Sequence, residues 1–126
     1  MTLEDIPEIQ LMDDPFEHID LTKKINYNGK FITIACPDGK NRIFSIHDYD
    51  SHLFVNEIFH STASSKYKVN GIKSETTGGG RLAINSEKVI ISESSRRYGK
   101  YSPEVVLPII ERFVRQHLPN RTIELK

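Results

Sequence analysis

The sequence has little cysteine: Cys36 is the only one among 126 residues. A single cysteine cannot form an intrachain disulfide or supply the several thiolates of a metal cluster. The glycine-rich loop closing on an arginine that a cysteine-nucleophile phosphatase needs does not follow Cys36. The sequence therefore argues against disulfide stabilisation and against phosphoryl transfer to a thiolate.

An excess of charge of either sign is also lacking. Seventeen basic residues balance seventeen acidic ones, so that the formal net charge is +0 with neutral histidines. A balanced protein has no long-range field that attracts nucleic acid or an anionic membrane. We expect neither as a partner, and an anion site has to be built from local residues.

Long apolar runs, internal repeats and low-complexity segments are missing as well. No window approaches the roughly 20 apolar residues of a membrane span, and Met1 to Leu11 contains acids and Pro7 instead of a basic start and an apolar run. At 126 residues the chain has the length of one domain. We expect a soluble, cytoplasmic, monomeric protein with a single domain over residues 1–126.

Two segments with strand patterns flank a segment whose residues favour a turn. Lys30 to Cys36 and Arg42 to His47 are rich in β-formers and flank Pro37-Asp38-Gly39-Lys40, which predicts a β-hairpin. Other segments also have strand character. They are Ile9 to Leu11, Lys66 to Asn85 with interruptions near Asn70-Gly71 and at the glycine triplet, Lys88 to Ser94 as a strand buried on both faces, and Thr122 to Leu125.

Two helices are predicted. Asp50-Ser51 offers N-cap residues for a helix that reaches about His60 and is broken by the polar stretch Ser61 to Ser65. Ser102-Pro103-Glu104 predicts the start of a second helix, with apolar residues at helical spacing after it. Pro108 removes one helical hydrogen bond, so this helix either kinks there or begins nearer Leu107. Strands and helices together predict an α/β (α+β) fold.

Two short segments are suited to an oxyanion. Gly78-Gly79-Gly80-Arg81 combines accessible backbone amides with a guanidinium that matches phosphate oxygens, and Ser94-Ser95-Arg96-Arg97-Tyr98-Gly99 adds hydroxyls and cations. The alternative is structural, since a glycine triplet is also typical of a turn or bulge. The basic residues after Ser95 are equally compatible with a solvated strand end.

His52 is the candidate catalytic residue. The first turn of a helix presents unpaired amides and a partial positive charge, which favour a bound anion and keep an imidazole neutral. A neutral imidazole acts as nucleophile or general base near pH 7. The alternative is an ordinary surface histidine. His47 with Asp48 and Asp50 would hold a metal only if these side chains converged, which the sequence does not show, and we expect neither metal nor other cofactor.

These residues, in this order, resemble the Janus family, whose best-known members are the small protein phosphohistidine phosphatases. The similarity covers most of the chain. It rests on Gly78-Gly79-Gly80-Arg81-Leu82, the strand Lys88 to Ile91, Ser95 with Tyr98-Gly99, the set His52, Val55, Glu57 and Phe59, and the start Ile6-Pro7-Glu8-Ile9.

The resemblance implies a mixed sheet of about six strands covered by two main helices and an enzyme that works without a metal. His52 would be nucleophile or general base, and Arg81 would clamp the phosphoryl group. Its oxygens would be bound by Ser95 and neighbouring groups, which include Gly79, Gly80, Ser94, Arg97 and Lys30. The substrate or partner would be a protein that carries phosphohistidine.

The sequence departs from the family pattern at several positions. The family's strand lysine is missing at Ile32 and near His18, which makes Lys30 or Arg42 its candidate substitute. Ser51 replaces an aromatic residue, and Arg97 replaces a small one. These changes keep a second hypothesis open: a catalytically weakened phosphate- or phosphoprotein-binding protein, like the divergent members with roles in sex differentiation and the germline. A third is an interaction protein whose glycine triplet is only a bend.

Overall fold

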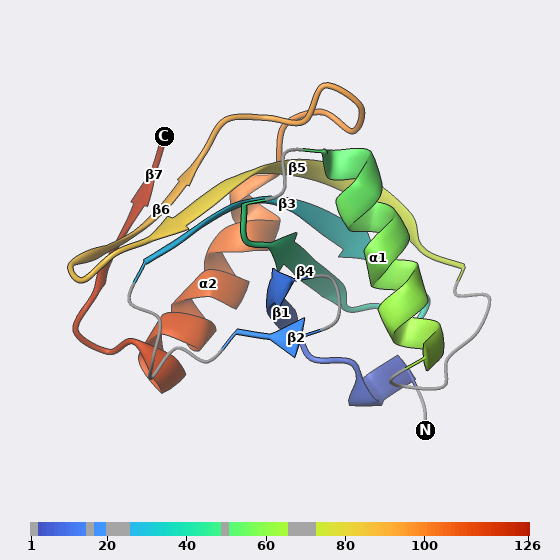
Figure 1. Ribbon diagram of the computed structural model, residues 1–126, viewed down its shortest axis with the longest axis horizontal. Coiled ribbons are helices and arrows are strands. Elements are labelled where there is room, and N and C mark those ends of the chain that lie inside the picture. The colour runs from blue at the N-terminus through green and yellow to red at the C-terminus, as the bar shows by residue number, and fades with distance from the viewer. Residues whose placement is uncertain (1–2, 15–16, 20–25, 49–50, 66–72) are drawn as a thin grey trace.

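The structure is a computed structural model that describes residues 3–14, 17–19, 26–48, 51–65 and 73–126. These residues form one mixed sheet of seven strands with two α-helices (Figure 1). The elements in chain order are η1 (Leu3–Asp5), β1 (Ile9–Asp14), β2 (Glu17–His18), β3 (Tyr27–Ala35), β4 (Asn41–Ile46), α1 (His52–Ser65), β5 (Glu75–Ile84), β6 (Lys88–Ser92), α2 (Pro103–His117) and β7 (Thr122–Leu125).

The sheet confirms the predicted fold class. Its order is β2-β1-β4-β3-β5-β6-β7, with parallel pairs β1·β4 and β6·β7 and antiparallel pairs elsewhere. The described residues include one strand more than the six or so expected, because the two-residue β2 pairs with β1. The predicted hairpin is β3–β4, and Thr122–Leu125 is the predicted last strand. No helix in the described ranges is long and apolar enough to cross a membrane.

The helix α1 covers one face of the sheet and is longer than predicted. Val55, Phe59 and Ala63 follow one another at four-residue spacing, so they lie on one side of the helix, and all three are buried in one apolar cluster with Ile32 and Ile34 of β3. The expected break at Ser61 is wrong. Burial of Ala63 against the sheet stabilises the last turn more than the polar residues around it favour a loop.

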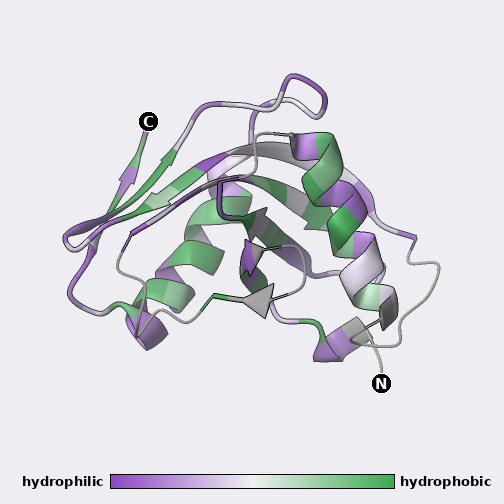
Figure 2. Ribbon diagram, in the orientation of Figure 1, coloured by the Kyte–Doolittle hydropathy of each residue, from purple (hydrophilic) through white to green (hydrophobic). Residues whose placement is uncertain are grey.

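The helix α2 covers the opposite face. Its buried residues pack with Phe31, Leu82, Val89 and Ile91 in a second apolar cluster. In Figure 2 hydrophobic residues colour parts of α2 and of the neighbouring strands. The helix begins at Pro103, as Ser102-Pro103-Glu104 predicts, and continues through Pro108. Since Pro108 lies on the exposed side, water can hydrogen-bond the carbonyl group that lacks an intrahelical partner.

Strand β5 runs without interruption through the glycine triplet, which corrects the predicted break there. Thr33 pairs with Gly78 and Ile34 with Thr76, so the irregularity is a bulge one residue earlier. The other predicted interruption, Asn70-Gly71, lies outside the described residues. Strand β6 is fully buried on one face only, because Val89 and Ile91 pack toward α2 while Ile90 is partly exposed. The expectation of burial on both faces is wrong.

Candidate functional site

His52 is the first residue of α1, held there by a capping serine. The Ser51 hydroxyl oxygen accepts a hydrogen bond from the Phe54 amide at 3.2 Å, and the Ser51 carbonyl accepts one from the Val55 amide at 3.0 Å. This is the N-cap that the sequence predicts. The imidazole turns onto the sheet and is 7% exposed, so His52 is not the surface histidine of the alternative reading.

The protonation of His52 follows from its partner. Its Nε2 lies 3.0 Å from the carbonyl oxygen of Gly80. A carbonyl oxygen only accepts hydrogen bonds, so Nε2 carries the hydrogen and Nδ1 holds the lone pair of the neutral ring. Among the described residues Nδ1 has no hydrogen-bond partner, which leaves it as the nucleophilic or basic atom.

Gly79 leaves room for this ring, and its amide is not available to bind an anion. A Cβ at Gly79 would lie 2.6 Å from the Phe31 carbonyl oxygen and 2.8 Å from Cδ2 of His52. The Gly79 amide donates to the Gly99 carbonyl at 3.1 Å, and the Gly79 carbonyl accepts from the Tyr101 amide at 3.2 Å. The predicted phosphate-binding role of the Gly79 amide is therefore wrong, because neighbouring backbone already uses it.

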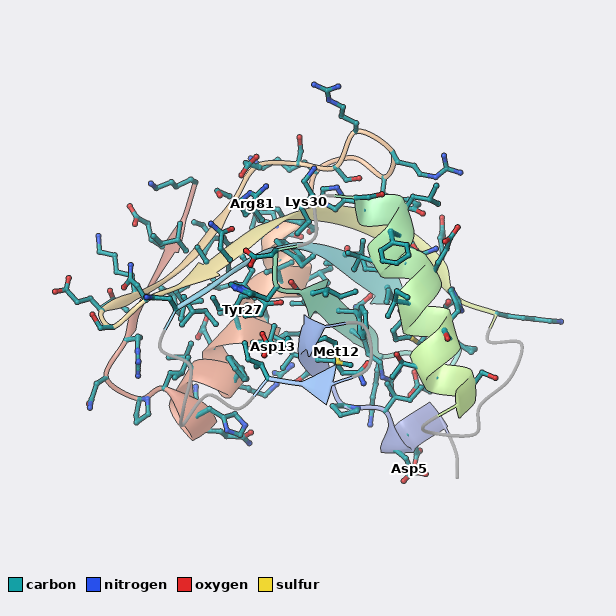
Figure 3. The ribbon with its side chains drawn as sticks, in the orientation of Figure 1. Asp5, Met12, Asp13, Tyr27, Lys30 and Arg81 are labelled. Atoms are coloured by element: carbon teal, nitrogen blue, oxygen red, sulfur yellow. The ribbon has the colours of Figure 1, made fainter. Side chains whose placement is uncertain are left out.

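Two cations share the face of the sheet on which His52 lies. Lys30 of β3 is the register partner of Arg81 in β5, and Arg81 follows Gly79 by two residues, which is the spacing of one strand face. Figure 3 shows the labelled Lys30 and Arg81 next to each other along the upper rim of the sheet. The fold thus brings residues 30, 52 and 81 together from three separate parts of the chain.

These surroundings keep the His52 imidazole neutral. Burial lowers the pKa of His52 below its usual 6.5, and the positive charges of Lys30 and Arg81 lower it further. The hydrogen bond to Gly80 and the carboxylate of Glu93 act in the opposite direction. A neutral ring whose Nδ1 has no hydrogen-bond partner among the described residues, near two cations, is suited to react with an anionic electrophile.

Arg81 is held by two residues that the sequence analysis did not single out. Its Nε donates to Oε2 of Glu93 at 2.7 Å, and its Nη1 donates to Oδ1 of Asn28 at 2.8 Å. The turn at Asn85, where the Asn85 side chain accepts from two following amides, is a signal that predicts the β5–β6 register. That register places Arg81 beside Ser92 and hence near Glu93.

Lys30 forms no ion pair with any described residue, whereas Arg81 is paired with Glu93. Of the two candidate substitutes for the family lysine, Lys30 alone lies beside His52. Arg42 is 2% exposed and is engaged by both carboxylate oxygens of Asp38, at 3.1 and 2.8 Å, and by the Ile6 carbonyl. Its role is therefore to join the hairpin to the N-terminal segment.

The second predicted segment forms a loop that closes on β5. The backbones of Ser95 and Gly99 bond to each other in both directions, and the hydroxyl oxygen of Ser95 accepts from the Tyr98 amide at 3.0 Å. Ser95 is 4% exposed, so its first role is to shape this loop. Ser94 and Arg97 are exposed on the loop, and the Arg97 guanidinium lies over the Tyr98 ring at 5.9 Å.

His47, the histidine considered as a metal ligand, has a role in the fold instead. Its Nδ1 accepts from the Asn28 amide at 3.0 Å, and its Nε2 lies 3.2 Å from Asp48. Within the ranges that the structure describes, no three histidine, cysteine or acidic side chains come together as metal ligands would.

Comparison with known proteins leaves the chain without an assigned family. No protein-family model matches it, and no curated protein matches it either. The function therefore has to be argued from the site itself.

Proposed function

We propose that the chain is a metal-independent protein phosphohistidine phosphatase, with His52 as the reacting group and Arg81 and Lys30 as the phosphoryl-binding cations. The observation that carries the proposal is the convergence of a neutral, buried imidazole with two cations on one sheet face. Two positive charges complement the two negative charges of a phosphoryl group. The resemblance to the Janus family points to the same chemistry for His52 and Arg81, with Lys30 as a substitute for the family's strand lysine.

The reaction breaks a P–N bond and needs little covalent help. In one route Nδ1 of His52 attacks phosphorus, the electron pair of the P–N bond moves to the substrate imidazole, and that nitrogen takes up a proton. Water then attacks the phosphorus on His52 and releases phosphate and the free ring. In the other route Nδ1 takes a proton from a water molecule that attacks phosphorus directly, while the electron pair of the P–N bond moves to the substrate imidazole and that nitrogen takes up a proton. Both routes yield histidine and phosphate, and the cations stabilise the charge on the equatorial oxygens.

The direct test is turnover of a peptide carrying phosphohistidine. The wild type is expected to release phosphate, and His52→Ala to release none above the uncatalysed rate because the reacting nitrogen is gone. His117→Ala is the matched control, since His117 is exposed at the end of α2. Wild-type turnover that persists in His52→Ala overturns the proposed role of His52.

Phosphate binding tests the cations separately from chemistry. Arg81→Ala is expected to weaken binding of inorganic phosphate roughly tenfold or more, because a charged hydrogen-bond donor to the anion is lost. Arg112→Ala is the control, since Arg112 also forms a surface pair with a glutamate, Glu8, but lies on α2. Equal affinity of wild type and Arg81→Ala in an NMR titration contradicts the assignment.

A second candidate is a protein that binds phosphate or a phosphorylated partner without turnover. The observation that favours it is the pairing of Arg81 with Glu93 and Asn28, which reduces the attraction of the guanidinium for a phosphoryl group. It predicts phosphate-induced shifts at His52 and Arg81 with no release of phosphate from the peptide. The same two measurements therefore separate the candidates.

A further inference from the structure

Glu93 stands at the end of β6, directly after the residue that pairs with Arg81. Its carboxylate oxygen Oε2 lies 2.7 Å from Nε of Arg81, and the two side chains are 56% and 26% exposed. The Glu93 carboxylate also acts on the imidazole, since it raises the pKa of His52 against the larger effect of burial. Glu93 thus pairs directly with the cation of the site, and its charge also acts weakly on the histidine.

The backbone of Glu93 has a conformation that is unusual for a residue other than glycine. Its φ is +64°, in the left-handed region that residues other than glycine and asparagine seldom adopt. This conformation ends β6 and begins the loop that returns to Gly79 through Ser95 and Gly99. A glycine would adopt it without strain, whereas glutamate places a negative charge at the arginine.

We propose that Glu93 competes with the phosphoryl group for Arg81 and so sets how strongly the site binds phosphate. The inference rests on the proposed function, and it assigns Glu93 as a residue that determines affinity and specificity. Carboxylate oxygens and phosphoryl oxygens both accept charge-assisted hydrogen bonds from the N–H groups of a guanidinium, so one excludes the other from the same N–H group. A ligand has to outcompete Glu93, and this favours a doubly charged phosphoryl group over a singly charged anion.

Asn28 holds the Arg81 guanidinium independently of Glu93. Its neutral Oδ1 accepts from Nη1 of Arg81 at 2.8 Å, on a different nitrogen from that used by Glu93. The guanidinium therefore keeps one anchor when Glu93 releases it. Loss of the carboxylate is expected to remove the competing negative charge from Nε without moving the guanidinium.

The test is titration of inorganic phosphate into wild type and Glu93→Gln, followed by NMR. Glutamine keeps the shape and still accepts a hydrogen bond, but it carries no charge. An exposed ion pair is worth up to about fivefold in an equilibrium constant, and repulsion between the carboxylate and phosphate adds a similar factor. We expect roughly tenfold tighter binding in Glu93→Gln and a further lowering of the pKa of His52.

Three further variants make the result specific. Glu93→Gly, which also removes the backbone strain, is expected to show the same gain. Glu87→Gln changes an exposed acid in the turn of the same hairpin and is expected to bind phosphate as wild type does. In the double variant Glu93→Gln with Arg81→Ala the gain is expected to disappear.

The outcomes separate this inference from the proposed function. Phosphate binding in wild type with no gain in Glu93→Gln or Glu93→Gly overturns the competition and leaves the proposed site standing. A gain that survives removal of Arg81 also overturns it, because the carboxylate then acts elsewhere. No binding in wild type or in either Glu93 variant overturns both.

Discussion

Replacing Gly79 by alanine tests the tightest contact of the candidate site. The added methyl would lie 2.6 Å from the Phe31 carbonyl oxygen, 2.8 Å from Cδ2 of His52 and 3.2 Å from its Nε2. The Phe31 oxygen belongs to the backbone of the central strand β3, so it cannot move without disturbing the sheet. The imidazole therefore has to leave its position against the Gly80 carbonyl.

The expected cost has two parts. Forcing a methyl group into a closely packed interior costs about 1–3 kcal/mol. Loss of the buried hydrogen bond between His52 Nε2 and the Gly80 oxygen adds about 1 kcal/mol. Urea denaturation is expected to show a free energy of unfolding lowered by about 2–4 kcal/mol, with turnover of the phosphohistidine peptide lost along with the ring position.

Gly78→Ala is the matched control for this change. Its methyl would lie 2.7 Å from the Lys100 carbonyl oxygen, on the face of the sheet away from His52. A comparable loss of stability is expected, but the imidazole NMR resonances of His52 should stay where they are. The reasoning is refuted if the free energy of unfolding of Gly79→Ala lies within about 0.5 kcal/mol of the wild-type value and the His52 resonances do not shift.

Two predictions concern pH. Burial lowers the pKa values of His52 and His60 below 6.5, so the unfolded state binds more protons than the folded state as the pH falls through 6.5. The free energy of unfolding should therefore decrease in this pH range. If His52→Ala shows the same dependence of stability on pH as wild type, this prediction is contradicted. Hydrogen bonds from Arg42 lower the pKa of Asp38 from 3.8 to about 2, so their stabilisation is present above pH 3.8 and is lost toward pH 2. Asp38→Asn should cost about 1–3 kcal/mol near pH 7, because the buried Arg42 loses its anion, and should remove this acid dependence; stability equal to wild type at both pH values contradicts it.

Local patterns predicted the elements where local physical chemistry dominates. The turn Pro37-Asp38-Gly39-Lys40, the N-cap Ser51 and the start Ser102-Pro103 each depend on a few neighbouring residues, and each lies where expected. The predictions failed where tertiary contacts outweigh local preference. The last turn of α1 is stabilised by burial of Ala63, and the glycine triplet stays extended because β3 pairs along it.

The site divides in the same way. The sequence alone, through its resemblance to a family, singled out His52, Arg81 and Lys30, since an imidazole at a helix start and a guanidinium after glycines have few roles. It did not reveal that the Gly79 amide is used by Gly99 or that Glu93 holds Arg81. Both contacts join segments 12 or more residues apart, and their geometry depends on strand register and on the loop after β6.

The sequence by itself thus determined most of the elements, the fold class and the chemical types available for a site. Only the tertiary structure decided which of these groups meet, which atom of His52 keeps its lone pair and which anion already occupies the arginine. The physical reason is that turns and caps are satisfied within a few residues of chain, whereas register, burial and ion pairing are set by segments that come together only in the folded sheet.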